Sequence, residues 1–115
     1  MSVTIWHNPR CSKSRETLAL LRARGIEPTI VEYLKTPPTA KEIKAAAKML
    51  GRPLRDLIRK KEAAYFDLGL DDETLAETDL APRLAENPSL IERPVVFAKG
   101  RAAIGRPPEA VLSLF

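Results

Sequence analysis

The chain has 115 residues, which is enough for one domain over residues 1–115 with its own core. With 44% hydrophobic and 30% charged residues, and no apolar run long enough to cross a bilayer, we expect a soluble, cytoplasmic protein without membrane association. The 19 Lys and Arg against 15 Asp and Glu give a net charge of +4, which suits a small anionic substrate. Nucleic acid is not an expected partner, because no basic run is interleaved with aromatic residues.

The first strand is expected at residues 3–6, a β-rich run, and Asn8-Pro9 then signals a turn. Helical spacing of polar and apolar residues begins at Ser12. Cys11 is therefore expected where the turn becomes a helix.

A helix N-terminus has unpaired N–H groups and the positive end of the helix dipole, so it stabilises an anion such as a thiolate. Arg10, Lys13 and Arg15 add positive charge around Cys11, which lowers a thiol pKa. The pattern predicts a reactive cysteine. The alternative is that Cys11 is a small buried hydrophobic residue, as lone cysteines commonly are.

One cysteine excludes an intramolecular disulfide, and Cys11 with the single histidine, His7, does not make a usual structural zinc site. No bound metal is expected. Any redox reaction at Cys11 must take its second thiol from another molecule.

Four elements are expected next along the chain. Apolar spacing, caps and breakers predict a helix over residues 16–24 that ends at Gly25, a strand over 29–34, a helix opened by a capping box at Thr39-Ala40-Lys41-Glu42, and a short helix over 54–60. The first strand, helix and second strand predict a right-handed βαβ unit.

The C-terminal part favours a helix over residues 74–86, whereas residues 61–71 have no clear pattern. Val95-Val96-Phe97 is the strongest strand signal, Lys99-Gly100 can turn the chain into a partner strand at 101–104, and a last short helix runs through Leu114. This order predicts an α/β fold: a thioredoxin-like (glutaredoxin-type) mixed sheet with a central helical insertion.

With these elements in place, the sequence resembles the glutaredoxin-coupled arsenate reductase family, a branch of the thioredoxin-like fold that includes the Spx regulators. The resemblance covers the whole chain and rests on six motifs in order: His7-Asn8-Pro9-x-Cys11 with Ser14-Arg15, Tyr33-Leu34-x-x-Pro37-Pro38, Leu57-Ile58-Arg59-Lys60, Leu68-Gly69-Leu70, Arg93-Pro94-Val95-Val96 and Gly105-Arg106-Pro107.

The resemblance implies that the Cys11 thiolate attacks arsenate. It also implies that three arginines hold the oxyanion: Arg59, Arg93 and Arg106. Arginine suits this task because its planar, permanently charged fork pairs two oxygens of a tetrahedral anion at once. Arginines gathered around Cys11 would also lower its pKa.

Four further residues are implied to support the thiolate. Arg15 lies next to Ser14 in the motif, and Pro94 is expected to have a cis peptide bond opposite the cysteine. His7 either tunes the thiolate or only hydrogen-bonds across the turn. Ser14 either donates a hydrogen bond to the thiolate or caps the helix.

The same resemblance implies glutathione as a co-substrate, glutaredoxin as a partner protein and no bound cofactor, and the expected state is a monomer. Ser12-Lys13 follows the cysteine where the best-known enzymes of the family have Gly-Thr, so two alternatives stay open. One is a glutathione-dependent thiol oxidoreductase with a non-arsenic substrate. The other is a non-enzymatic Spx-like interaction protein, although Ser14 interrupts the CxxC pair of such regulators.

Overall fold

The computed structural model describes residues 2–115. These residues form two compact units, one made of 2–36 and Arg93–Phe115 and the other of Pro37–Glu92. No helix between residues 2 and 115 is both long enough and apolar enough to span a bilayer. The single domain expected over residues 1–115 stays a prediction.

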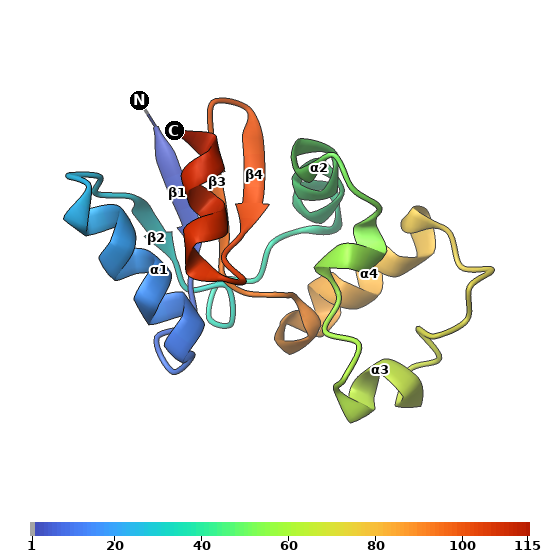
Figure 1. The fold of residues 1–115 in the computed structure, drawn as a ribbon. Helices are drawn as coiled ribbons and strands as arrows, with labels where there is room; N and C mark the ends of the chain where they lie inside the picture. The colour runs from blue at the N-terminus through green and yellow to red at the C-terminus, as the bar shows by residue number, and fades with distance from the viewer. Residues whose placement is uncertain (1) are drawn as a thin grey trace. The chain divides into compact units, whose positions relative to one another are not determined.

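The first unit is built on a four-stranded mixed sheet with the strand order β2-β1-β3-β4 (Figure 1). β1 (Val3–Trp6) is parallel to β2 (Thr29–Val31) and antiparallel to β3 (Val95–Ala98), which pairs with the antiparallel β4 (Arg101–Ile104). α1 (Ser12–Ala23) connects the two parallel strands, so the predicted βαβ unit is confirmed.

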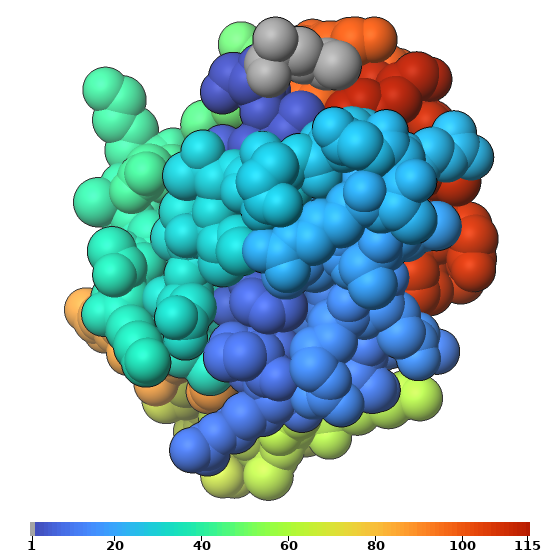
Figure 2. Space-filling view, turned by 90° about the vertical axis from the view of Figure 1, so that its left-hand side faces the viewer, coloured from blue at the N-terminus to red at the C-terminus, as the bar shows by residue number. Residues whose placement is uncertain are grey.

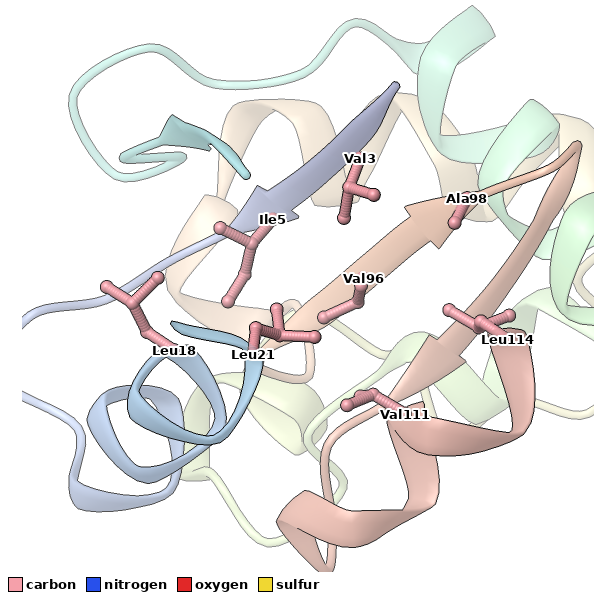
Figure 3. Packing of buried hydrophobic residues seen from close by; sticks show 8 residues of the cluster. All are labelled: Val3, Ile5, Leu18, Leu21, Val96, Ala98, Val111 and Leu114. Carbon is pink, nitrogen blue, oxygen red and sulfur yellow. The ribbon is translucent and has the colours of Figure 1, made fainter. Parts of the chain in front are cut away.

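Two helices cover one face of this sheet, α1 and the 3-10 helix η3 (Pro108–Leu114) (Figure 3). Alternate strand residues point to this face and meet apolar residues of both helices in one buried cluster of Val3, Ile5, Leu18, Leu21, Val96, Ala98, Val111 and Leu114. This packing anchors α1 against the sheet. Its first turn therefore has a fixed place beside the end of β1.

β2 is one edge of the sheet, and Figure 2 looks onto this side, where α1 and the segment after it form the surface. The predicted strand over residues 29–34 is too long, because β2 ends at Val31. Val31 pairs with Trp6, the last residue of β1, so no partner strand continues beyond it. The chain then turns, and the N–H groups of Lys35 and Thr36 both donate to the Glu32 carbonyl at 2.9 Å.

The hairpin of β3 and β4 turns at Lys99 and Gly100, as predicted. Both residues have a left-handed backbone, with φ of 56° and 72°. Such turns match the twist of the two strands. The pairing runs from Val95 opposite Ile104 to Ala98 opposite Arg101.

The second unit is helical. It consists of α2 (Ala40–Leu50), η1 (Leu54–Leu57), α3 (Ala63–Asp67), α4 (Glu77–Glu86) and η2 (Pro88–Leu90). α2 packs on η1 and α4, and its start has the predicted capping box. Thr39 Oγ1 accepts from the Glu42 N–H at 3.1 Å, and Glu42 Oε1 accepts from the Thr39 N–H at 2.9 Å.

The helix expected over residues 74–86 begins later, at Glu77. Asp72 Oδ1 accepts from the Thr74 N–H at 2.9 Å, and this side-chain turn holds residues 72–74 out of a helix. Asp79 then accepts from the Ala76 N–H at 2.9 Å, which marks the true start. The short helices expected near residues 54 and 108 form as 3-10 helices.

Candidate active site

The loop between β1 and α1 places Cys11 at the first turn of the helix. The Cys11 N–H donates to the Asn8 carbonyl at 3.0 Å, and the Arg10 N–H donates to Asn8 Oδ1 at 3.0 Å, so Asn8 closes the turn. The Cys11 carbonyl then accepts the first helical bond, from the Arg15 N–H at 3.0 Å. Cys11 is partly exposed, so the alternative of a buried structural cysteine is wrong.

The surroundings of Cys11 lower its pKa below the ordinary value of 9.0. Partial burial is the largest single influence and raises the pKa, because it disfavours the charged thiolate. The backbone N–H groups of Ser14 and Lys13 and the charges of Arg93 and Arg106 together outweigh it. The N–H groups are the ones expected at a helix N-terminus, whereas the charges that lower the pKa come from Arg93 and Arg106 and not from the neighbouring Arg10, Lys13 and Arg15.

Two arginines reach this site from the β3–β4 hairpin. Arg93 lies two residues before β3 and Arg106 two residues after β4. Because Val95 and Ile104 are paired in antiparallel strands, both arginines lie at the same end of the hairpin. Arg106 Nη2 is 3.6 Å from Cys11 Sγ, close enough for a hydrogen bond to sulfur.

The Arg106 side chain is held in this direction by a second bond, since its Nε donates to the Arg93 carbonyl at 2.8 Å. A cis peptide bond joins Arg93 to Pro94, as expected, and a second, unpredicted cis bond joins Arg106 to Pro107. Pro94 is buried, and its carbonyl accepts from the Gly105 N–H at 2.9 Å. The segments that carry the two arginines are thus bonded to each other.

The Ser14 side chain belongs to the loop. Its hydroxyl lies 2.6 Å from His7 Nδ1 and accepts from the Asn8 N–H at 3.0 Å, and both His7 and Ser14 are buried. Ser14 therefore supports the thiolate through its backbone N–H, while its hydroxyl bonds to the chain just before Cys11. The hydroxyl does not cap the helix, whose N-cap residue is Cys11.

Burial lowers the pKa of His7 below its ordinary value of 6.5, and Arg22 and Arg15 lower it further while Glu32 opposes them. The ring is therefore neutral at pH 7. Ser14 Oγ and His7 Nδ1 share one hydrogen bond, in which the neutral ring accepts from the Ser14 hydroxyl or donates to it according to its tautomer. Of the two roles open for His7, the hydrogen bond across the turn is present, and a catalytic role in tuning the thiolate stays a prediction.

This neutral histidine should make the protein less stable in acid. The unfolded chain takes up a proton on His7 near pH 6.5, whereas the folded chain does so only at lower pH. The free energy of unfolding should therefore fall as the pH drops through this interval, by at most ~1.4 kcal/mol per pH unit for one proton. Urea titrations of the wild type and His7→Asn at several pH values test this, and equal pH slopes in the two proteins would contradict it.

Arg15 is exposed and holds the loop from outside, since its Nη1 donates to the Pro9 carbonyl at 2.9 Å. Arg59 belongs to the second unit. Its Nη1 donates to the Ser89 carbonyl at 3.2 Å, and its Nη2 forms a close ion pair with Glu62. Its expected part in binding the oxyanion stays a prediction.

Among residues 2–115, no three His, Cys, Asp or Glu side chains gather closely enough to hold a metal ion. The chemistry that this site offers is that of one activated sulfur beside fixed cations. The unpaired N–H groups predicted to stabilise the thiolate at the helix start are those of Lys13 and Ser14.

The ArsC family model matches residues 6–114. The chain belongs to the ArsC family. The resemblance found in the sequence is thereby confirmed, and the match extends over both units.

Relatives in the ArsC family cover nearly the whole chain. The chain is 51% identical over 113 residues to YfgD of Escherichia coli K12, and the match covers 97% of this chain and 95% of that protein. It is 47% identical over 115 residues to an arsenate reductase of Haemophilus influenzae, covering 99% of both chains. A solved arsenate reductase structure from Vibrio cholerae superposes with a TM-score of 0.97 at 49% identity, covering 100% of this chain and 98% of that one. The predicted thioredoxin-like α/β class is confirmed.

Proposed function

We propose that this ArsC-family chain is an arsenate reductase, in which the Cys11 thiolate attacks the arsenic of bound arsenate. The observation that carries this proposal is the 3.6 Å approach of Arg106 Nη2 to Cys11 Sγ at the start of α1. A thiolate and an arsenate ion repel each other, so their reaction needs cations that face both. The printed names of the Haemophilus and Vibrio relatives support the choice of arsenate.

In this proposal Arg93 and Arg106 bind the oxyanion beside the sulfur. Arg106 uses Nε on the Arg93 carbonyl and directs Nη2 to Cys11, which leaves further N–H groups for arsenate oxygens. Arg93 adds a second charge that lowers the Cys11 pKa. Arg59 is proposed as the third arginine on the basis of its motif.

The reaction is a substitution followed by a reduction. Cys11 Sγ forms a bond to arsenic, and one arsenate oxygen leaves as water. Glutathione then adds its sulfur to arsenic and displaces a second water. A glutaredoxin thiolate attacks the glutathione sulfur, and the electron pair of the sulfur–arsenic bond reduces As(V) to As(III). Hydrolysis releases arsenite and restores Cys11, leaving a glutathione–glutaredoxin disulfide.

External thiols are required because Cys11 is the only cysteine of the chain. Ser14, at the position of a resolving thiol, has its hydroxyl bonded to His7 and Asn8. We propose that the protein works as a monomeric, cytoplasmic enzyme of one domain without a bound cofactor. The continuous family match over residues 6–114 supports the single domain.

A steady-state assay tests the function. Purified protein, glutathione and glutaredoxin are mixed with arsenate, and disulfide formation is followed by coupled reduction. We expect oxidation that depends on arsenate and saturates with it, and that needs both thiols. The same rate without arsenate, or with sulfate in its place, would contradict arsenate as the substrate.

A second candidate is a glutathione-dependent thiol oxidoreductase. It is favoured by the fact that the helix N-terminus and the charges of Arg93 and Arg106 lower the pKa of Cys11 without requiring arsenic. The two functions differ in substrate. Turnover of a glutathionylated peptide in the absence of arsenate, with no response to arsenate, would select this second function.

A further inference from the structure

Gly105 is the residue before Arg106, and it is packed too tightly for any side chain. A Cβ atom added to it would lie 2.5 Å from Thr17 Oγ1 and 2.8 Å from Pro94 Cγ. Both distances are shorter than real Cβ contacts. Unlike Gly100, Gly105 has no left-handed backbone, so glycine is needed here for space.

Its neighbour Thr17 lies one turn after Lys13 on α1. Thr17 is completely buried, and its hydroxyl donates to the Lys13 carbonyl at 2.8 Å. That hydrogen bond fixes Oγ1, so the side chain presents one defined surface to Gly105. The contact therefore sets how closely α1 approaches the end of β4.

The contact between Thr17 and Gly105 joins the two chain segments that carry Cys11 and Arg106. Cys11 is the N-cap residue of α1, and Arg106 follows Gly105 directly. On the Gly105 side, the N–H bond to the Pro94 carbonyl ties the strand end to the segment of Arg93. A change in the separation of Thr17 and Gly105 must therefore change the distance between sulfur and guanidinium.

We propose that Thr17 and Gly105 are positioning residues, whose direct contact sets the approach of Arg106 to Cys11. Each residue acts through the element that carries a reacting or binding group. The value of this approach for catalysis rests on the proposed function. The approach of Arg106 affects the pKa of the Cys11 thiol, and this pKa can be measured without arsenate.

The experiment measures how strongly Arg106 acts on Cys11 in different backgrounds. The rate of Cys11 alkylation is determined against pH for the wild type, Arg106→Gln, Gly105→Ala and the double variant. Because the chain has one cysteine, the profile reports a single thiol pKa. In the wild type background we expect Arg106→Gln to raise that pKa and to slow alkylation below it by ~3-fold per pKa unit, since a more basic thiolate is also more nucleophilic.

In the Gly105→Ala background the same Arg106 substitution should have little effect, because the methyl group has already moved the guanidinium away. A merely structural role of Gly105 would lower stability but leave the effect of Arg106 intact. An unchanged effect of Arg106 in folded Gly105→Ala would therefore overturn the proposal. Activity assays then separate the two proposals, because a wild type that never reduces arsenate would refute the function and leave this result standing.

A matched pair of second-site variants identifies Thr17 as the partner. Thr17→Ala removes the oxygen that lies nearest to the added methyl group, whereas Thr17→Ser keeps it. Gly105→Ala/Thr17→Ala should bring the Cys11 pKa part of the way back to the wild-type value, whereas Gly105→Ala/Thr17→Ser should not. If Gly105→Ala alone is unfolded, the first double variant should also regain part of the folded state, and the second should not. Equal behaviour of the two double variants, including equal failure to fold, would overturn the role of Thr17.

Discussion

Cys11→Ser should abolish arsenate-dependent oxidation of glutathione and glutaredoxin, with a loss in kcat of at least ~10³-fold. A serine hydroxyl stays protonated at pH 7, so the backbone N–H groups of Ser14 and Lys13 and the nearby arginines have no anion to stabilise. No other cysteine of the chain can replace it. The measurement is the steady-state assay with all three substrates present.

The serine variant should fold normally, since Cys11 is partly exposed and lies outside the buried cluster of α1 and the sheet. Circular dichroism and urea unfolding provide that control. Turnover by Cys11→Ser close to that of the wild type would mean that arsenic reacts elsewhere, and the proposed mechanism would be wrong.

Arg106→Ala should reduce kcat/KM for arsenate by ~10²–10³-fold, the loss typical for removal of one fixed donor at a developing charge. It should also raise the Cys11 pKa, because the variant loses the cation 3.6 Å from Sγ. Both effects have one cause, so they should appear together. Kinetics with varied arsenate and the pH profile of alkylation measure them.

Two further variants show whether the loss of kcat/KM in Arg106→Ala comes from the missing charge or from the missing guanidinium geometry. Arg106→Lys keeps the charge but lacks the planar fork whose Nε and Nη2 bond to the Arg93 carbonyl and to Cys11, so it should recover the thiol pKa better than the arsenate kinetics. Arg101→Ala is the matched control, because Arg101 begins β4 and its Nη2 donates to the Ser113 carbonyl. A loss in Arg101→Ala as large as in Arg106→Ala would point to net charge instead of geometry.

The position of Cys11 could be predicted because its causes are local. An Asn-Pro turn after a β-rich run and a helical pattern from Ser12 are sufficient to place it at a helix start. The hairpin at Lys99-Gly100 was predictable for the same reason. The end of β2 could not be predicted in this way. β2 ends at Val31 because its partner Trp6 is the last residue of β1, which is a different strand.

The details of the site depend on contacts between distant parts of the chain. The Ser14 hydroxyl bonds to His7 instead of the thiol, and no local pattern distinguishes these two partners. Thr17 meets Gly105 across 88 positions, so neither residue carried a sequence signal beyond helix spacing and a motif. Arg59 was selected by its motif alone, and its part in the site stays a prediction.

The most direct measurement is a crystal structure of the protein grown with arsenate. It should show a tetrahedral anion that faces Cys11 Sγ and is hydrogen-bonded to the guanidinium groups of Arg93 and Arg106. A contact between Arg59 and the same anion would complete the predicted set of three arginines. An anion bound away from Cys11 at saturating arsenate, or a sulfur turned into the apolar interior, would contradict the account.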